Sequence, residues 1–346
     1  MKTGFETRQP RSVVISTLSL LLLIGGLLPV RGAGTDAKEQ GLRIDRRPAP
    51  CDFHHGPLAE APKYNPANNS PFQVDLRGYD LSRLDLREAG IAMTHASFDD
   101  RTVWPAPERM PADFDRLRIA ELGKNPGLGV RSLHARGITG RGVGIAIVDN
   151  PLLVDHQEYG ERLRLYEENN VTAETPAHMH GPAVASIAAG KTVGVAPEAD
   201  LYYIGRWAMD LVAGTDGESP LNFEYDAKAV ERILQINEQL PPERKIRVIS
   251  ISIGWSSDQK GYREVTAAVQ KAKAAGMLVI CSSVEEIHGF KFHGLGRDLH
   301  ADPNDFASYR PARWGTQMYG SHDRLLVPMD ARTTASPTGK DEYVFY

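Results

Sequence analysis

The hydrophobic positions in the second half of the chain follow two alternating patterns. Short apolar runs bounded by glycine, proline or charged residues are typical of buried strands. These runs lie at residues 144–149, 201–204, 246–252, 277–282 and 325–327. Apolar or small residues at helical spacing predict helices over 180–189, 224–240 and 262–276. Because strand and helix alternate, we expect an α/β fold with a parallel sheet and helices on both faces.

A different repeat precedes this region. Leu76, Leu81, Leu86 and Ile91 recur every five residues, and an aspartate stands just before each leucine. The pattern resembles pentapeptide repeats, which wind into a square β-helix. Four units make only about one coil, and stacked repeats need neighbours to bury their apolar side chains. We therefore expect a short pro-region or edge that packs on the following domain, rather than a separate repeat domain.

The N-terminus has the pattern of a targeting segment. Basic residues precede an apolar run at 13–30, and small residues follow at 32–34. This order is typical of a secretory signal peptide. The run is long for a cleaved signal, and Arg31 lies at the expected cleavage position, so an uncleaved membrane anchor is an alternative. Both interpretations predict an extracytoplasmic protein, either secreted or in the cell envelope.

These patterns divide the chain into four segments. Residues 1–34 are interpreted as the signal peptide or membrane anchor. Residues 35–71 are rich in alanine, proline, asparagine and charge, and are expected to be a disordered linker or pro-segment. Residues 72–125 are the pentapeptide-repeat-like pro-region, and residues 126–346 are the α/β domain.

The composition indicates which kinds of binding partner the chain is expected to have. The 346 residues are 41% hydrophobic and 24% charged, with a formal net charge of −4, as in ordinary globular domains. No basic cluster indicates a nucleic-acid partner. We expect membrane contact only through the N-terminal segment, if that segment stays uncleaved. The two cysteines, Cys51 and Cys281, lie in different contexts and indicate neither a disulfide framework nor a zinc site.

Two residues at the predicted sheet edge suggest chemistry. Asp149 ends a buried strand, and His180 begins the small-residue helix within "HMHGPAVASIAAG". Active sites of parallel sheets gather at the carboxyl ends of the strands. A neutral imidazole is a good general base, and a carboxylate that accepts its Nδ1–H fixes the tautomer. Either residue alone is compatible with a capping or structural role, whereas the pair at one edge indicates a catalytic site.

The chain resembles a subtilisin-like serine peptidase (subtilase) over roughly residues 125–346. The resemblance rests on motifs in the family's order, at residues 140–159, 178–190 with 193–204, 247–254 and 272–283. The first surrounds Asp149, and the second contains His180 and the tail "VGVAPEADLYYI". The family's fold is a parallel α/β sheet of the kind that the periodicity predicts.

The resemblance implies a role for each matching residue. Asp149 would orient the base, and His180 would be the general base; His178 is a weaker candidate because no glycine follows it. Ser252 and Gly254 would pair with the backbone of an extended polypeptide substrate, a form of β-augmentation. The implied function is that of an exported serine endopeptidase.

Two departures from the family pattern stand out. The asparagine that usually donates to the oxyanion is absent after the fourth strand, and loss of such a donor weakens transition-state binding by about 3–4 kcal/mol. Ser282 and Ser283 are the remaining candidates for that donor. No Gly-x-Ser-small turn follows Ser283, and Ser336 lies in "SPTG", which is typical of a turn.

We therefore expect a chain truncated before the nucleophile helix, with the catalytic serine beyond residue 346 and no activity in the chain itself. The alternative is a non-catalytic peptide-binding protein on the same scaffold. Truncation would also uncover an apolar face of the sheet, expected at Ile145, Ile147, Ile249, Ile251 and Val279.

One segment matches nothing in this scheme. Residues 288–306 contain several histidines and aspartates, and carboxylates suit Ca²⁺. Their spacing matches no calcium loop, so we interpret the segment as a solvated loop. No motif supports a metal site or a cofactor.

Overall fold

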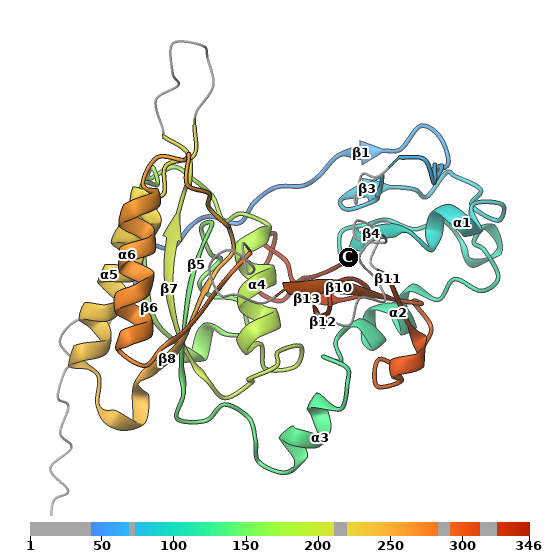
Figure 1. The fold of residues 1–346 in the computed structure, drawn as a ribbon. Coiled ribbons are helices and arrows are strands. Elements are labelled where there is room, and N and C mark those ends of the chain that lie inside the picture. The colour runs from blue at the N-terminus through green and yellow to red at the C-terminus, as the bar shows by residue number, and fades with distance from the viewer. Residues whose placement is uncertain (1–42, 69–72, 211–219, 283–290, 312–323) are drawn as a thin grey trace, which may run out of the picture. The chain divides into compact units, whose positions relative to one another are not determined.

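Parallel strands in the order β6-β7-β5-β8-β9 form the central sheet of the computed structural model (Figure 1). Their bounds are Leu163–Asn169 for β6, Asp200–Arg206 for β7, Gly144–Asp149 for β5, Ile246–Ile251 for β8 and Leu278–Cys281 for β9. The structure describes residues 43–68, 73–210, 220–282, 291–311 and 324–346. The expected signal peptide or anchor at 1–34 lies outside these residues. None of the described helices is long and apolar enough to cross a membrane.

Helices cover both faces of this sheet, as Figure 1 shows. Helices α5 (Glu224–Gln239) and α6 (Tyr262–Ala274) pack on one face, and α4 (His180–Ala189) packs on the other. Strand β5 is apolar on both sides because its alternate residues face different helices: Ala146 and Val148 face α5 and α6, and Ile147 faces α4. The predicted parallel α/β fold is therefore confirmed.

Strand β6 was not predicted from the sequence. It is an edge strand whose second half carries Glu167 and Glu168, which break the apolar pattern. Both carboxylates are paired: Glu167 accepts from Arg232 of α5, and Glu168 accepts from Arg46 at 2.6 and 2.7 Å. Arg46 lies in the segment expected to be unstructured. There, Ile44 forms a parallel bridge with Tyr166 of β6, so this part of the chain lies along the sheet edge.

The expectation of an uncovered apolar face named the wrong residues. Ile145, Ile147, Ile249, Ile251 and Val279 are all at most 9% exposed. They belong to two different faces, one covered by α4 and the other by α5 and α6. The exposed apolar residues of the central sheet's described strands are instead Leu278 (55%) and Ile280 (38%) of edge strand β9. They alternate with Val279 and Cys281, which face α5 and α6, so they lie on the α4 face.

The predicted strand at 325–327 is present as β12 (Arg324–Pro328), but it lies outside the central sheet. It pairs in parallel with β10 (Lys291–Arg297), which pairs on its other side with antiparallel β11 (Tyr309–Pro311). Strand β10 falls within the segment interpreted as a solvated loop. That interpretation is therefore wrong for residues 291–297, whose backbone groups enter a sheet.

The five-residue repeat forms a small coil before the central sheet. Its elements are β1 (Gly56–Pro57), β2 (Val74–Asp75), β3 (Tyr79–Asp80), α1 (Gly90–Met93) and β4 (Ala96–Asp99). Strand β1 pairs in parallel with β3, and β2 pairs in parallel with β4. Strand β4 also pairs with β14 (Tyr343–Phe345), which forms a hairpin with β13 (Thr333–Ala335). The coil thus shares a sheet with the last hairpin of the described chain.

Other short helices connect these elements. They are η1 (Pro107–Arg109), α2 (Arg116–Gly123), α3 (Val130–Ala135), η2 (Gly160–Arg162), η3 (Pro242–Arg244) and η4 (Phe306–Ser308). Asp115 caps α2 by accepting from the backbone N–H groups of Leu117 and Arg118.

The repeat positions separate into a buried set and an exposed one. Leu76, Leu81 and Leu86 are at most 1% exposed, whereas Ile91 is 73% exposed in α1. Leu81→Ala should therefore lower the free energy of unfolding by about 2–5 kcal/mol, because it leaves a cavity in a closed core. Ile91→Ala should change it by no more than about 0.5 kcal/mol. Denaturant unfolding of both variants measures this difference. Equal losses of unfolding free energy would contradict a coil whose core is formed by the three buried leucines.

Candidate active site

Asp149 and His180 meet at the carboxyl edge of the central sheet. The Nδ1 atom of His180 lies 2.8 Å from Oδ1 and 2.9 Å from Oδ2 of Asp149. An ionised carboxylate only accepts hydrogen bonds, so Nδ1 carries the proton and donates it. The Asp149 side chain is 2% exposed and that of His180 is 47% exposed. The sequence therefore predicted a contact that is present, with the carboxylate buried and the imidazole reaching solvent.

The small residues of α4 explain how this contact is reached. A Cβ on Gly181 would lie 2.6 Å from the Asn150 carbonyl oxygen and 2.6 Å from the Tyr203 hydroxyl oxygen, so only glycine fits there. The Tyr203 hydroxyl in turn donates to the Asn150 carbonyl at 2.6 Å. The helix start is therefore in direct contact with the turn that follows Asp149, which brings His180 within reach of the carboxylate.

His178 has a different role from His180. Its Nδ1 accepts the backbone N–H of His180 at 3.3 Å, so it satisfies a donor in the first turn of α4. Its ring packs edge-on against Trp207, with ring centroids 5.8 Å apart. The structure thus brings His180, and not His178, to Asp149.

The charges around the pair act in opposite directions on the base. The hydrogen bond to Asp149 raises the pKa of the His180 imidazole, while burial and the positive charge of Arg206 lower it. Burial lowers the pKa of His178, and the neighbouring His180 lowers it further. A neutral His178 keeps Nδ1 free to accept the hydrogen bond at the start of α4.

The predicted peptide-binding edge lies just after β8. Ser252 donates its N–H to the Val148 carbonyl at 3.4 Å and continues the ladder for one residue. Beyond it, the peptide groups of Ile253 and Gly254 make no hydrogen bond with any residue that the structure describes. Both residues are half-buried. Within the described part of the chain, the backbone donors and acceptors of these two residues are therefore unused.

The serines lie in very different environments. Ser282 is exposed immediately after β9, and Ser283 lies outside the described residues. Ser336 is 1% exposed, and its Oγ lies 2.5 Å from the Thr338 hydroxyl oxygen and accepts the Thr338 N–H. Ser336 is therefore a buried turn residue, as its sequence context predicted, and not an accessible nucleophile.

The aspartates of the unexplained segment are used locally. The Oδ1 atoms of Asp298, Asp302 and Asp305 each accept the backbone N–H two residues ahead. Among the described residues, no group of three or more histidine, cysteine, aspartate or glutamate side chains could hold a metal ion.

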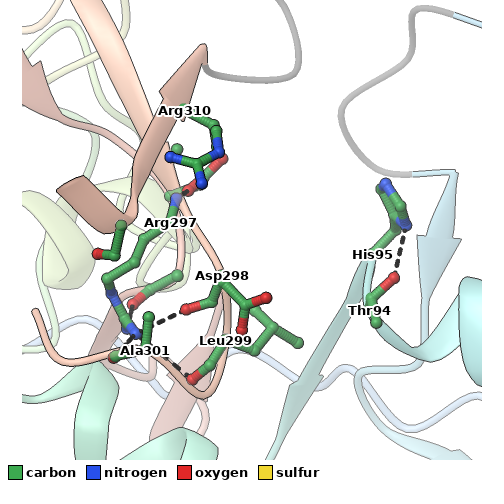
Figure 2. Close-up of a pocket in the computed structure, with 11 residues that line it drawn as sticks. Thr94, His95, Arg297, Asp298, Leu299, Ala301 and Arg310 are labelled. Atoms are coloured by element: carbon green, nitrogen blue, oxygen red, sulfur yellow. Dashed lines mark hydrogen bonds between the residues drawn. The ribbon is translucent and has the colours of Figure 1, made fainter.

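A cavity of about 400 Å³ lies in this region, away from Asp149 and His180. Figure 2 shows Arg297 on its wall, with the guanidinium bonded to backbone carbonyls of Asp298, Leu299 and Ala301. Arg310 and Asp330 also line it, so the charges on the wall are mixed. Neither Asp149 nor His180 lines this cavity.

Sequence analysis missed a buried ion pair near the site. Nε of Arg206, the last residue of β7, donates to Oδ1 of Asp226 in the first turn of α5 at 2.8 Å. The two side chains are 5% and 0% exposed. A charged residue that ends an apolar strand, followed by an acidic residue at the start of the next helix, is the signal that could have indicated it.

Comparison with known proteins finds a family match for residues 140–288 of the chain. Residues 140–288 match the model of the subtilase family, Peptidase S8. The subtilisin-like protease PopC of Myxococcus xanthus (strain DK1622) is 36% identical over 140 residues, which are 37% of this chain and 28% of PopC. The chain thus matches little more than a quarter of the length of this curated relative.

Solved structures also resemble the chain, at low sequence identity. The prenylagaramide maturation protease PagA is 15% identical, with a TM-score of 0.41, over 61% of this chain and 71% of PagA. A cold-adapted subtilisin-like serine proteinase is 16% identical, with a TM-score of 0.39, over 60% of this chain and 70% of that one. The family match confirms the resemblance seen in the motifs over residues 140–288, and it supports a function of the serine-peptidase kind.

The Asp149–His180 bond generates a prediction on pH dependence. Because the pKa of His180 is raised in the folded state, the folded state binds this proton more tightly than the unfolded state. The resulting stabilisation is complete below the unfolded pKa of about 6.5 and is lost as pH rises through the folded pKa. Asp149→Asn should lower the pKa of His180 and remove this part of the pH dependence.

NMR titration of the His180 ring, with denaturant unfolding at about pH 5 and about pH 8, measures both effects. Asp298→Asn, in an exposed turn, is the matched control and should leave the His180 titration unchanged. An unaltered His180 pKa in the Asp149→Asn variant would show that the hydrogen bond does not form in solution.

Proposed function

We propose that this chain, which carries a subtilase region over residues 140–288, provides the aspartate and histidine of an exported serine endopeptidase. The observation that carries the proposal is the Asp149–His180 pair at the carboxyl edge of the sheet. His180 donates through Nδ1, and its Nε2 makes no hydrogen bond with any described residue. An Nε2 with no partner among the described residues, on an imidazole oriented through Nδ1, is what a general base requires.

The reaction follows from this arrangement. Nε2 of His180 takes the proton of a serine hydroxyl as the serine oxygen attacks the carbonyl carbon of the scissile peptide bond. Asp149 stabilises the imidazolium that forms. The imidazolium then gives its proton to the leaving amine, which produces an acyl-enzyme. Water, deprotonated by the same His180, hydrolyses the acyl-enzyme and restores the serine.

The substrate is an extended polypeptide held at the edge after β8. The half-buried peptide groups of Ile253 and Gly254 have no partner among the described residues, which supports pairing with a substrate backbone. Such pairing supplies affinity through backbone hydrogen bonds and leaves side-chain selection to neighbouring pockets. Ser252 is the last residue tied to the sheet, so it fixes where this edge begins.

None of the described serines is placed as the nucleophile. Ser336 is buried in its turn, and no described serine is hydrogen-bonded to His180. Ser282, exposed at the end of β9, is a candidate oxyanion donor in place of an asparagine amide, with Ser283 as its neighbour. The N-terminal basic and apolar pattern supports an extracytoplasmic location.

A serine-directed fluorophosphonate probe tests the proposal. The 346-residue chain should not be labelled, because none of its described serines is hydrogen-bonded to His180. The product of the complete reading frame should be labelled, and His180→Ala should reduce that labelling by at least about a hundredfold, because the general base is lost. His300→Ala, in the turn after β10, is the matched control and should leave labelling unchanged.

The outcomes also separate the two candidate functions. Labelling of the 346-residue chain would show that one of its own serines is the nucleophile. Absence of labelling in the complete product, together with retention of extended peptides, would indicate the non-catalytic peptide-binding protein instead.

A further inference from the structure

We propose that Arg206 and Asp226 form a positioning pair for the base: the buried guanidinium, on the sheet face opposite the Asp149–His180 pair, offsets part of the negative charge that Asp149 presents to His180. The inference rests on the proposed function, in which His180 acts as a base. It assigns a role to an ion pair on the opposite face of the sheet from the catalytic residues.

The strand register puts the two pairs next to each other. Asp149 of β5 lies opposite Gly205 of β7, and Arg206 is the next residue along β7. Successive side chains of a strand point to opposite faces. Gly205 shares the α4 face with Tyr203, so Arg206 lies on the α5 face, where it meets Asp226. One strand edge therefore carries a carboxylate on one side and a guanidinium on the other.

A contribution to fold stability does not by itself explain the buried Arg206–Asp226 ion pair. The Arg206 side chain is 5% exposed and that of Asp226 is fully buried. Asp226 Oδ2 has no hydrogen-bond partner in the described part of the chain. Burial of two charges is expensive, and replacement of a buried pair by apolar residues is often neutral or stabilising. An incompletely bonded buried pair beside a catalytic residue is better explained by its electric field.

The positive charge of Arg206 acts against protonation of His180, which is the direction that a general base requires. Among the described residues, the charged or titratable groups coupled to His180 are Asp149 at the end of β5, His178 before α4, and Arg206 at the end of β7. Asp149 favours the imidazolium, and Arg206 disfavours it. Asp226 is bonded to Arg206 through one carboxylate oxygen, Oδ1, so it neutralises the guanidinium only in part. The guanidinium thus offsets part of the effect of the carboxylate.

Opposite charge changes give a test that does not depend on activity. NMR titration of His180 in the 346-residue chain should show a higher pKa in Arg206→Gln and a lower pKa in Asp226→Asn, each shifted on the order of half a unit. In the double variant, Arg206→Gln with Asp226→Asn, the pKa of His180 should shift less than in either single variant, because the two charge changes oppose each other. Arg206→Lys, which keeps the positive charge, should titrate like the parent chain.

A purely structural pair predicts a different result. Loss of packing would move both single variants in the same direction, or leave His180 unchanged, and either outcome overturns the proposal. If one single variant fails to fold, the other still decides against Arg206→Lys, since its shift must have the predicted sign: a higher pKa in Arg206→Gln or a lower pKa in Asp226→Asn. Opposite shifts in a complete product that never labels with the fluorophosphonate would refute the peptidase and leave the charge coupling standing.

Discussion

The close approach of α4 to the carboxyl end of β5 is the constraint on which the candidate site depends. At Gly181 the helix backbone lies so near the Asn150 carbonyl and the Tyr203 hydroxyl that a methyl group would collide with both. This contact fixes where the first turn of α4 begins, and His180 is the residue at that turn. The hydrogen bond to Asp149 then follows from backbone positions, so the fold itself orients the imidazole.

The other side of α4 is held by buried polar contacts to the β13–β14 hairpin. Ser186 accepts the backbone N–H of Ala335 at 2.9 Å. The buried Glu158 carboxylate accepts from Thr192, just after α4, and from the Tyr343 hydroxyl of the hairpin. Arg332, at the start of the hairpin, donates to the Val193 carbonyl at 2.7 Å. Because β14 also pairs with β4, the coil formed by the five-residue repeat contributes to the same support.

Much of this arrangement could be predicted from the sequence, because it depends on periodicity and on strand ends. The apolar runs predicted β5, β7, β8 and β9, and the position of Asp149 and His180 relative to them predicted their contact. Edge strand β6 was not predicted, because its two glutamates break the apolar pattern and are paired with arginines that are distant in the sequence. The covered and uncovered faces could not be predicted either, since alternation in a strand does not reveal which helix lies on each side.

The buried polar side chains were the least predictable part of the structure. In our proposal, one buried pair, Arg206 and Asp226, adjusts the protonation of His180. A sequence shows that Arg206 ends a strand, but not that the register sets it one residue beyond the position opposite Asp149. That offset of one residue puts the carboxylate and the guanidinium on opposite faces of one sheet edge. They cannot form an ion pair with each other there, so each takes another partner: Asp149 takes His180, and Arg206 takes Asp226. The field of Arg206 still reaches the base, and a strand edge with this register can therefore bind the imidazole strongly while limiting how readily it becomes protonated.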